Sequence, residues 1–107
     1  MSLRNRVPSY KILVESEDQS KGALNRLIAN VGEVKSSSDE ATLRNYMRSL
    51  KEAHNAFRSF NLELSNWFDK NASHARSEEV DEERREIHGE YKLCYRKMNN
   101  RFRGIGF

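Results

Sequence analysis

The chain has 107 residues, of which 36% are hydrophobic and 33% are charged, with a net charge of +3. This size and composition predict a single domain, residues 1–107, with one elongated core. The sequence has no apolar run near the roughly 20 residues of a membrane span, and its N-terminus does not resemble a secretory signal. Cys94 is the only cysteine, which excludes an internal disulfide and favours an intracellular, cytoplasmic location.

The first predicted helix follows Pro8 and covers residues 9–31. Its inner side carries Tyr10, Leu13, Val14, Leu24, Leu27, Ile28 and Val31. Residues 15–22 are polar, so a break in this helix is one alternative, and an extended segment over residues 12–14 is another. We expect residues 32–36 to form a loop.

The second predicted helix covers residues 38–70 and begins at a capping box formed by Ser37 and Glu40. Along it, a stripe recurs in alternating steps of four and three residues, which is typical of a helix face that contacts other helices. The stripe consists of Leu43, Met47, Leu50, His54, Phe57, Asn61, Leu64 and Phe68. A second stripe in steps of seven residues widens this face enough for two partner helices: Tyr46, Ala53, Phe60 and Trp67.

The third predicted helix covers residues 77–103, with Ser77 or a neighbour as its cap. Its apolar positions are Val80, Ile87, Tyr91, Cys94, Met98 and Phe102. Residues 71–90 hold seven acidic residues and three arginines, whereas residues 91–107 hold five basic residues and no acidic one. The helix dipole favours this order of charges in a solvated helix. The alternative is head-to-tail docking between the acidic start of one molecule and the basic end of another.

Short connections between long helices make neighbouring helices antiparallel. The sequence therefore predicts an all-α fold, an elongated three-helix antiparallel (up-down-up) bundle with coiled-coil-like packing. We expect Leu43, Leu50, Phe57, Leu64, Ile87, Tyr91 and Met98 to carry the core.

No residue pattern in the chain predicts enzymatic chemistry. The histidines have no metal-ligand spacing, and no nucleotide-binding or nucleophile motif occurs. Glutamates in a helix bundle can bind two metals, but this requires Glu-x-x-His motifs on facing helices, and the spacing from Glu83 to His88 is wrong. We therefore expect a non-enzymatic protein with no metal and no cofactor.

Two polar residues, His54 and Asn61, interrupt the apolar stripe of the second helix. We expect His54 to be partly buried and hydrogen-bonded to a neighbour. For both residues, either the polar group sets the register of the helices or the edge of the bundle reaches water there. Trp67 is interpreted as core or as cover for the end of the bundle, and if it is exposed it becomes an anchor for a partner.

The favoured partner is a protein, either a second copy of the chain in a homodimer or larger assembly, or another segment of a polyprotein. The candidate interface residues are Asn61, Trp67, Glu79, Glu83, Glu86, Arg96 and Arg101. The alternative is weak nucleic-acid binding by the basic C-terminal end, where basic residues alternate with aromatic ones. Its candidate contacts are Arg96, Lys97, Arg101 and Arg103.

Four segments of the chain resemble a helical domain of unknown function near the N-terminus of Pao/BEL-type LTR retrotransposon polyproteins. These segments are residues 20–27 (SKGALNRL), residues 43–50 (LRNYMRSL), Phe57 with Leu64, and residues 83–91. Asn25 stands where that family usually has threonine, and Arg44 and Arg48 have other offsets from Leu43 than the family pattern. The resemblance implies a gag-like, non-enzymatic part of a polyprotein with a role in particle assembly.

A competing resemblance is to spectrin-type repeats, which have nearly this length and three long helices. Those repeats usually carry a tryptophan in the first helix, whereas Trp67 lies near the end of the second predicted helix. This resemblance would imply a cytoskeletal or trafficking adaptor.

Overall fold

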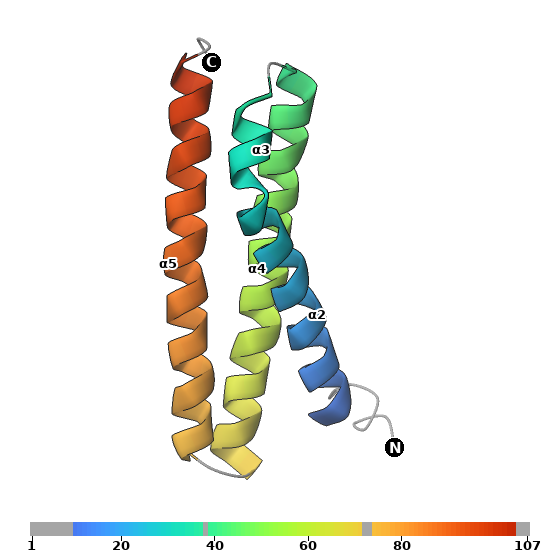
Figure 1. Ribbon diagram of the computed structural model, residues 1–107. Helices are drawn as coiled ribbons and strands as arrows, with labels where there is room; N and C mark the ends of the chain where they lie inside the picture. The colour runs from blue at the N-terminus through green and yellow to red at the C-terminus, as the bar shows by residue number, and fades with distance from the viewer. Residues whose placement is uncertain (1–9, 38, 72–73, 105–107) are drawn as a thin grey trace.

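The computed structural model describes residues 10–37, 39–71 and 74–104 (Figure 1). These residues form helices α2 (Tyr10–Ala29), α3 (Val31–Lys35), α4 (Glu40–Asn71) and α5 (His74–Gly104). The all-α class is confirmed, with four helices in the described part of the chain where three were predicted. None of these helices is long and apolar enough to cross a membrane.

The first predicted helix is interrupted at Asn30, not within residues 15–22, and residues 12–14 are helical. Both alternatives for its first half are therefore wrong. The polar middle of α2 is held by Lys21, whose Nζ lies 3.7 Å from Glu17 Oε1 and 3.9 Å from Asp18 Oδ1, one turn earlier. Residues 32–35 of the expected loop form α3 together with Val31, and in this helix Val34 N donates to Asn30 O.

Helix α4 begins at Glu40, and Asp39 caps it in place of the predicted box of Ser37 and Glu40. Asp39 Oδ1 accepts a hydrogen bond from the Ala41 amide at 3.2 Å, and its Oδ2 accepts one from the Thr42 hydroxyl at 2.8 Å. The Glu40 side chain pairs with Arg44 along the helix. Asp39 can replace the predicted cap because its carboxylate satisfies the free amides of the first turn directly.

Helix α5 begins at His74, three residues before the predicted start. Ser77 thus lies within the helix and is not its cap. It is buried against α4, where its carbonyl accepts a hydrogen bond from the Ser65 hydroxyl at 3.4 Å. Residues 72–73, between α4 and α5 in the sequence, lie outside the described residues.

The stripe on α4 forms the centre of the core, as predicted, and all eight of its side chains are buried. In the second stripe Tyr46 is buried, and the other three residues are half-buried. The other buried apolar residues are Leu13, Leu24, Ile87, Cys94 and Met98. Of the seven predicted core residues only Tyr91 is half-buried, and the side chain of Phe102 lies outside the described set.

Figure 1 shows α2 and α3 running in one direction, α4 in the opposite direction and α5 in the first direction again. The molecule is elongated, with principal extents of 53 × 29 × 18 Å. Helix α2 packs mainly on α4 and leans away from α5 towards its N-terminal end, whereas α3 contacts both long helices. Lys11, on α2, is therefore at the opposite end of the molecule from the basic end of α5.

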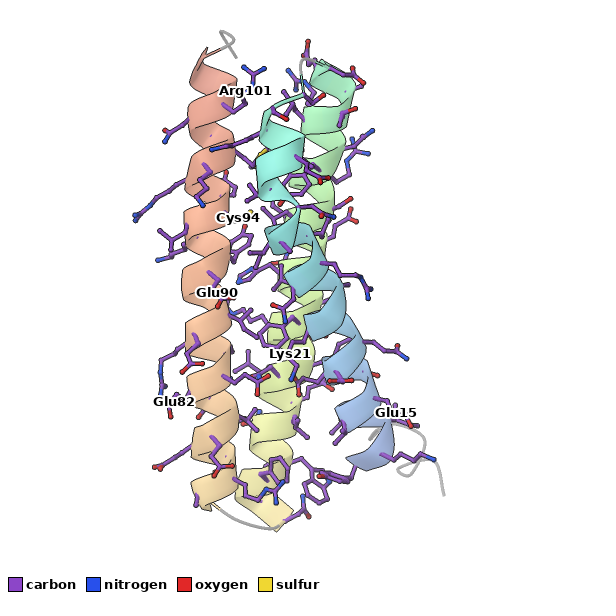
Figure 2. All side chains as sticks on the ribbon, in the orientation of Figure 1. Glu15, Lys21, Glu82, Glu90, Cys94 and Arg101 are labelled. Carbon is purple, nitrogen blue, oxygen red and sulfur yellow. The ribbon has the colours of Figure 1, made fainter. Side chains whose placement is uncertain are left out.

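Polar contacts of three side chains, Arg101, Tyr46 and Lys21, fasten the segment of α2 and α3 to the hairpin of α4 and α5. At the α3 end, Arg101 reaches from α5 and donates to Lys35 O at 2.7 Å and Ser37 O at 2.9 Å (Figure 2). The Tyr46 hydroxyl on α4 donates to Leu27 O and lies 3.1 Å from Cys94 Sγ on α5.

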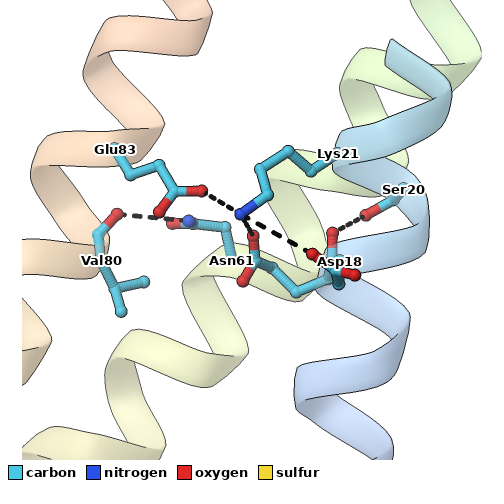
Figure 3. Close-up of polar contacts among 7 residues, drawn as sticks. Asp18, Ser20, Lys21, Asn61, Val80 and Glu83 are labelled. Atoms are coloured by element: carbon cyan, nitrogen blue, oxygen red, sulfur yellow. Dashed lines mark hydrogen bonds and ion pairs between the residues drawn. The ribbon is translucent and has the colours of Figure 1, made fainter. Parts of the chain in front are cut away.

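In the middle of the molecule, Lys21 Nζ lies 2.6 Å from Glu83 Oε1 and so links α2 to α5 (Figure 3). Lys21 also faces Glu17, which is buried and whose pKa is raised, mainly because burial disfavours the charged carboxylate. This ion pair connects α2 and α5 at the level where the two helices begin to diverge.

Candidate anion-binding groove

A hollow of about 300 Å³ opens between α4 and α5 and is lined only by basic side chains. Its lining residues are His54 and Arg58 from α4, and Arg84, Arg85 and His88 from α5. They meet because His54 and Arg58 are one helical turn apart, as are Arg84 and His88, and α4 and α5 are antiparallel. No acidic side chain lies among these lining residues in the described part of the chain.

The two histidines form the floor of this hollow. His54 Nε2 lies 3.0 Å from His88 Nδ1, and the His54 ring stacks on Tyr91 with ring centroids 3.8 Å apart. The predicted hydrogen bond of His54 to a neighbour is confirmed, and its side chain is buried where partial burial was expected. The hydrogen bond needs one nitrogen to accept, so full protonation of both rings would break it.

The arginines of this hollow differ in how they are held. Arg84 is fixed, since its Nη1 lies 2.9 Å from Asn61 Oδ1 and 3.0 Å from Asp81 Oδ1. Arg58 and Arg85 are exposed and form no ion pair with another residue that the structure describes. Arg84 therefore supplies a positioned charge, while Arg58 and Arg85 are free to close on a ligand.

A second hollow of about 400 Å³ continues along α5 from His88 towards its C-terminal end. It is lined by His88, Tyr91, Lys92, Tyr95, Arg96 and Asn99. Lys51 of α4 lies over the Tyr95 ring, with Nζ 5.4 Å from the centroid. We call the two adjoining hollows the basic groove, and its chemistry suits a ligand with several negative charges.

The candidate interface residues do not form one surface. Asn61 is completely buried, so it does not reach water and is not on the surface that a partner contacts. Its amide donates to Val80 O at 3.2 Å and its oxygen accepts from Arg84, which favours a role in setting register. Trp67 is half-buried against Tyr10, with ring centroids 4.5 Å apart, as expected for cover at the end of the bundle.

The charged candidates separate onto different parts of α5. Glu83 is held by Lys21, and Arg101 is held by the carbonyl groups of Lys35 and Ser37, so both fasten the fold internally. Glu79 and Glu86 are exposed.

The three nucleic-acid candidates whose side chains are described, Arg96, Lys97 and Arg101, are not brought together either. Arg96 lines the basic groove, Lys97 is exposed, and Arg101 is tied to the α3 end. The side chain of Arg103 lies outside the described set. The structure thus joins Arg96 to His88 and Lys92 instead of to Arg101.

Sequence reasoning missed Arg58, Arg84 and Arg85. The available signal was a basic residue one turn from a histidine on each of two helices. Turning this signal into a site required the register that places His54 opposite His88, and the stripes alone do not specify that register.

The stability of the protein should fall when the pH drops through the ordinary histidine range. The pKa of His54 lies below its ordinary value of 6.5, first because of burial and then because of the charges of His88 and Arg58. As the pH falls, the unfolded chain thus takes up this proton before the folded chain does, so folding is weakened below about pH 6.5. Thermal melts at about pH 7.5 and about pH 5.5 measure this effect.

The matched variant for this test is His54→Gln, in which the drop in Tm between the two pH values should be smaller. Glu17 acts in the opposite sense, because its raised pKa lets the folded chain bind a proton first as the pH falls. Glu17→Gln should therefore enlarge the drop. An equal drop in the His54→Gln variant and the unmodified chain would contradict the assignment.

Comparison with known proteins gives no match to a protein family, a curated protein or a solved structure. Among the residues that the structure describes, no three His, Cys, Asp or Glu side chains gather in a way that could hold a metal ion.

Proposed function

We propose that this domain is a non-enzymatic assembly module that binds a second copy of itself through two oppositely charged sides of α5. The observation that carries the proposal is the separation of charge around this helix. An acidic ridge recurs in steps of three and four residues, all exposed: Glu79, Glu82, Glu86 and Glu90. Figure 2 shows Glu82 on the side of α5 away from α4, whereas the hollow lined by Arg58 and Arg85 lies between the two helices. Glu79, at the start of the ridge, lies nearer to α2, where it lines a hollow with Tyr10 and Val14.

The acidic ridge and the basic groove have matching lengths. Glu79 and Glu90 are eleven residues apart, as are Arg85 and Arg96. At about 1.5 Å per residue each row extends about 16 Å along the helix axis. A ridge from one copy can therefore lie along the groove of another with its carboxylates facing basic groups throughout.

Exposed leucines favour an antiparallel arrangement of the two copies of α5. Leu93, 58% exposed, continues the acidic ridge by one turn, and Leu62, 39% exposed, follows Arg58 by one turn on α4. Antiparallel docking places Leu93 against Leu62, Glu90 near Arg85 and Glu79 near Arg96. Parallel docking would instead bring Leu93 to the charged end of the groove.

The charge pairs set the expected strength and symmetry of this contact. Exposed ion pairs contribute at most about 1 kcal/mol each, so the association should be weak and should decrease with salt. The ridge and the groove are different surfaces, so the contact is heterologous and extends into rings or open chains. Such an assembly role is also what the resemblance to gag-like polyprotein domains implies.

Light scattering over a range of protein and salt concentrations tests the proposal. The unmodified chain should exceed the monomer mass of 12.5 kDa at low salt. The ridge variant, Glu79→Gln with E82Q, E86Q and E90Q, should be monomeric. A control with the same change in net charge uses exposed glutamates on the other helices: Glu15→Gln with E33Q, E52Q and E63Q.

Mixing two variants makes the test specific to the ridge and the groove. The groove variant, Arg58→Gln with R85Q, K92Q and R96Q, should also be monomeric by itself. In a mixture, the intact ridge of the groove variant should bind the intact groove of the ridge variant. The resulting heterodimer should not grow further, because both of its intact surfaces are then occupied. A chain that is monomeric at every concentration and salt, or a control variant that also loses association, overturns the proposal.

A further inference from the structure

The hollow at the His54 end of the basic groove has the composition of a phosphate site. Arg58 and Arg85 reach it from different helices, and neither is neutralised by a described carboxylate. Arg84 is held at its edge by Asn61 and Asp81. Guanidinium groups from two sides give a phosphate several charge-assisted hydrogen bonds, which a single exposed arginine does not provide.

The continuation of the groove adds aromatic rings to this charge. Tyr91 and Tyr95 both line the second hollow, with ring centroids 6.0 Å apart. The group that covers the Tyr91 ring is the buried ring of His54, whereas the group over the half-buried Tyr95 ring is the exposed, flexible side chain of Lys51. Because Lys51 can move aside towards a phosphate, Tyr95 is the better platform for a flat ligand group. Lys92 and Arg96 follow the same path along α5.

Cations and rings along one path match a flexible polyanion that has flat groups between its charges. Single-stranded nucleic acid has this chemistry, because its phosphates contact basic residues while its unpaired bases stack on aromatic side chains. Duplex DNA keeps its base faces inside the stack and presents none to Tyr95. An acidic protein segment has the charge but no ring to stack there.

We propose that the basic groove binds single-stranded nucleic acid, with a phosphate between Arg58 and Arg85 and a base on Tyr95. This inference goes beyond self-assembly and moves nucleic-acid contact from the C-terminal end to the middle of α5. Because the acidic ridge of a second copy would occupy the same groove, nucleic acid and self-association compete.

Fluorescence anisotropy with a labelled oligouridylate of about 12 nucleotides tests the proposal at several salt concentrations. With three phosphates contacted, one by Arg58 and Arg85 together and one each by Lys92 and Arg96, the logarithm of the affinity should fall with the logarithm of salt concentration with a slope of about −2. Arg58→Gln with Arg85→Gln should weaken binding at least tenfold and reduce the slope to about −1.5. The charge-matched control is Arg26→Gln with Lys70→Gln, two exposed residues outside the groove.

Variants of Tyr95 distinguish the contribution of base stacking from the contribution of charge. Tyr95→Ala should weaken oligonucleotide binding at least about fivefold, whereas Tyr95→Phe keeps the ring and should bind like the unmodified chain. Circular dichroism melts of both variants test whether the fold is retained. Polyglutamate of similar length serves as the competing class of ligand, and its binding should not change in Tyr95→Ala.

The ridge variant distinguishes this inference from the proposed assembly. Glu79→Gln with E82Q, E86Q and E90Q should lose self-association and still bind the oligonucleotide at least as tightly as the unmodified chain. No oligonucleotide binding by the unmodified chain overturns the inference, as does equal weakening in the Arg26 and Lys70 control. Equal binding of polyglutamate and oligonucleotide, with no effect of Tyr95→Ala, assigns the groove to acidic protein instead.

Discussion

Replacing Phe57 with alanine is expected to lower the free energy of unfolding by about 3 to 5 kcal/mol. Phe57 is 1% exposed and lies midway along α4, in the main core cluster with Leu50 and Ile87. The substitution removes the packing contacts of the buried ring. It also leaves a cavity that the two long helices cannot close without losing their other contacts. Urea unfolding followed by circular dichroism measures the change.

The matched control for Phe57→Ala is Leu93→Ala, measured at a protein concentration too low for association. Leu93 is 58% exposed, so its truncation should change the free energy of unfolding by only about 0.5 kcal/mol. Unchanged stability in Phe57→Ala would contradict the assignment of Phe57 to the core.

Replacing Asn61 with alanine is expected to lower the free energy of unfolding by about 1 to 3 kcal/mol, although it removes a polar residue from an apolar stripe. Asn61 is completely buried, and both ends of its side-chain amide are hydrogen-bonded: Nδ2 donates to Val80 O at 3.2 Å, and Oδ1 accepts from Arg84 Nη1 at 2.9 Å. In the alanine variant the half-buried Arg84 guanidinium loses its hydrogen bond to Asn61. The hydrogen bonds by which Asn61 aligns α4 with α5 are lost as well. Thermal and urea unfolding give the magnitude.

Asn55→Ala is the control, since Asn55 is exposed on the same helix and the substitution carries the same gain in helix propensity. Its free energy of unfolding should change by no more than about 0.5 kcal/mol. If Asn61→Ala and Asn55→Ala unfold alike, Asn61 does not set the register. Because Arg84 is no longer held in place in Asn61→Ala, this variant should also bind ligands more weakly at the basic groove.

The helices themselves were largely predictable from sequence. The stripe from Leu43 to Phe68 was predicted to face the core, and all its members are buried, because helical periodicity puts them on one face whatever the partners are. The start of α4 was misplaced, because Ser37 and Asp39 are both good caps and only the path of the chain selects one. Similarly, residues 32–36 lack the strong propensity that would have predicted α3.

The sequence by itself determined the all-α class, the buried face of α4 and the change of charge along α5, because these follow from local spacing and composition. Tertiary structure decided which polar groups meet. The pairing of His54 with His88, the fixing of Arg84 by Asn61 and the use of Arg101 as an internal fastener depend on the register between helices. That register results from packing and hydrogen bonds between residues far apart in the chain, which local periodicity does not encode.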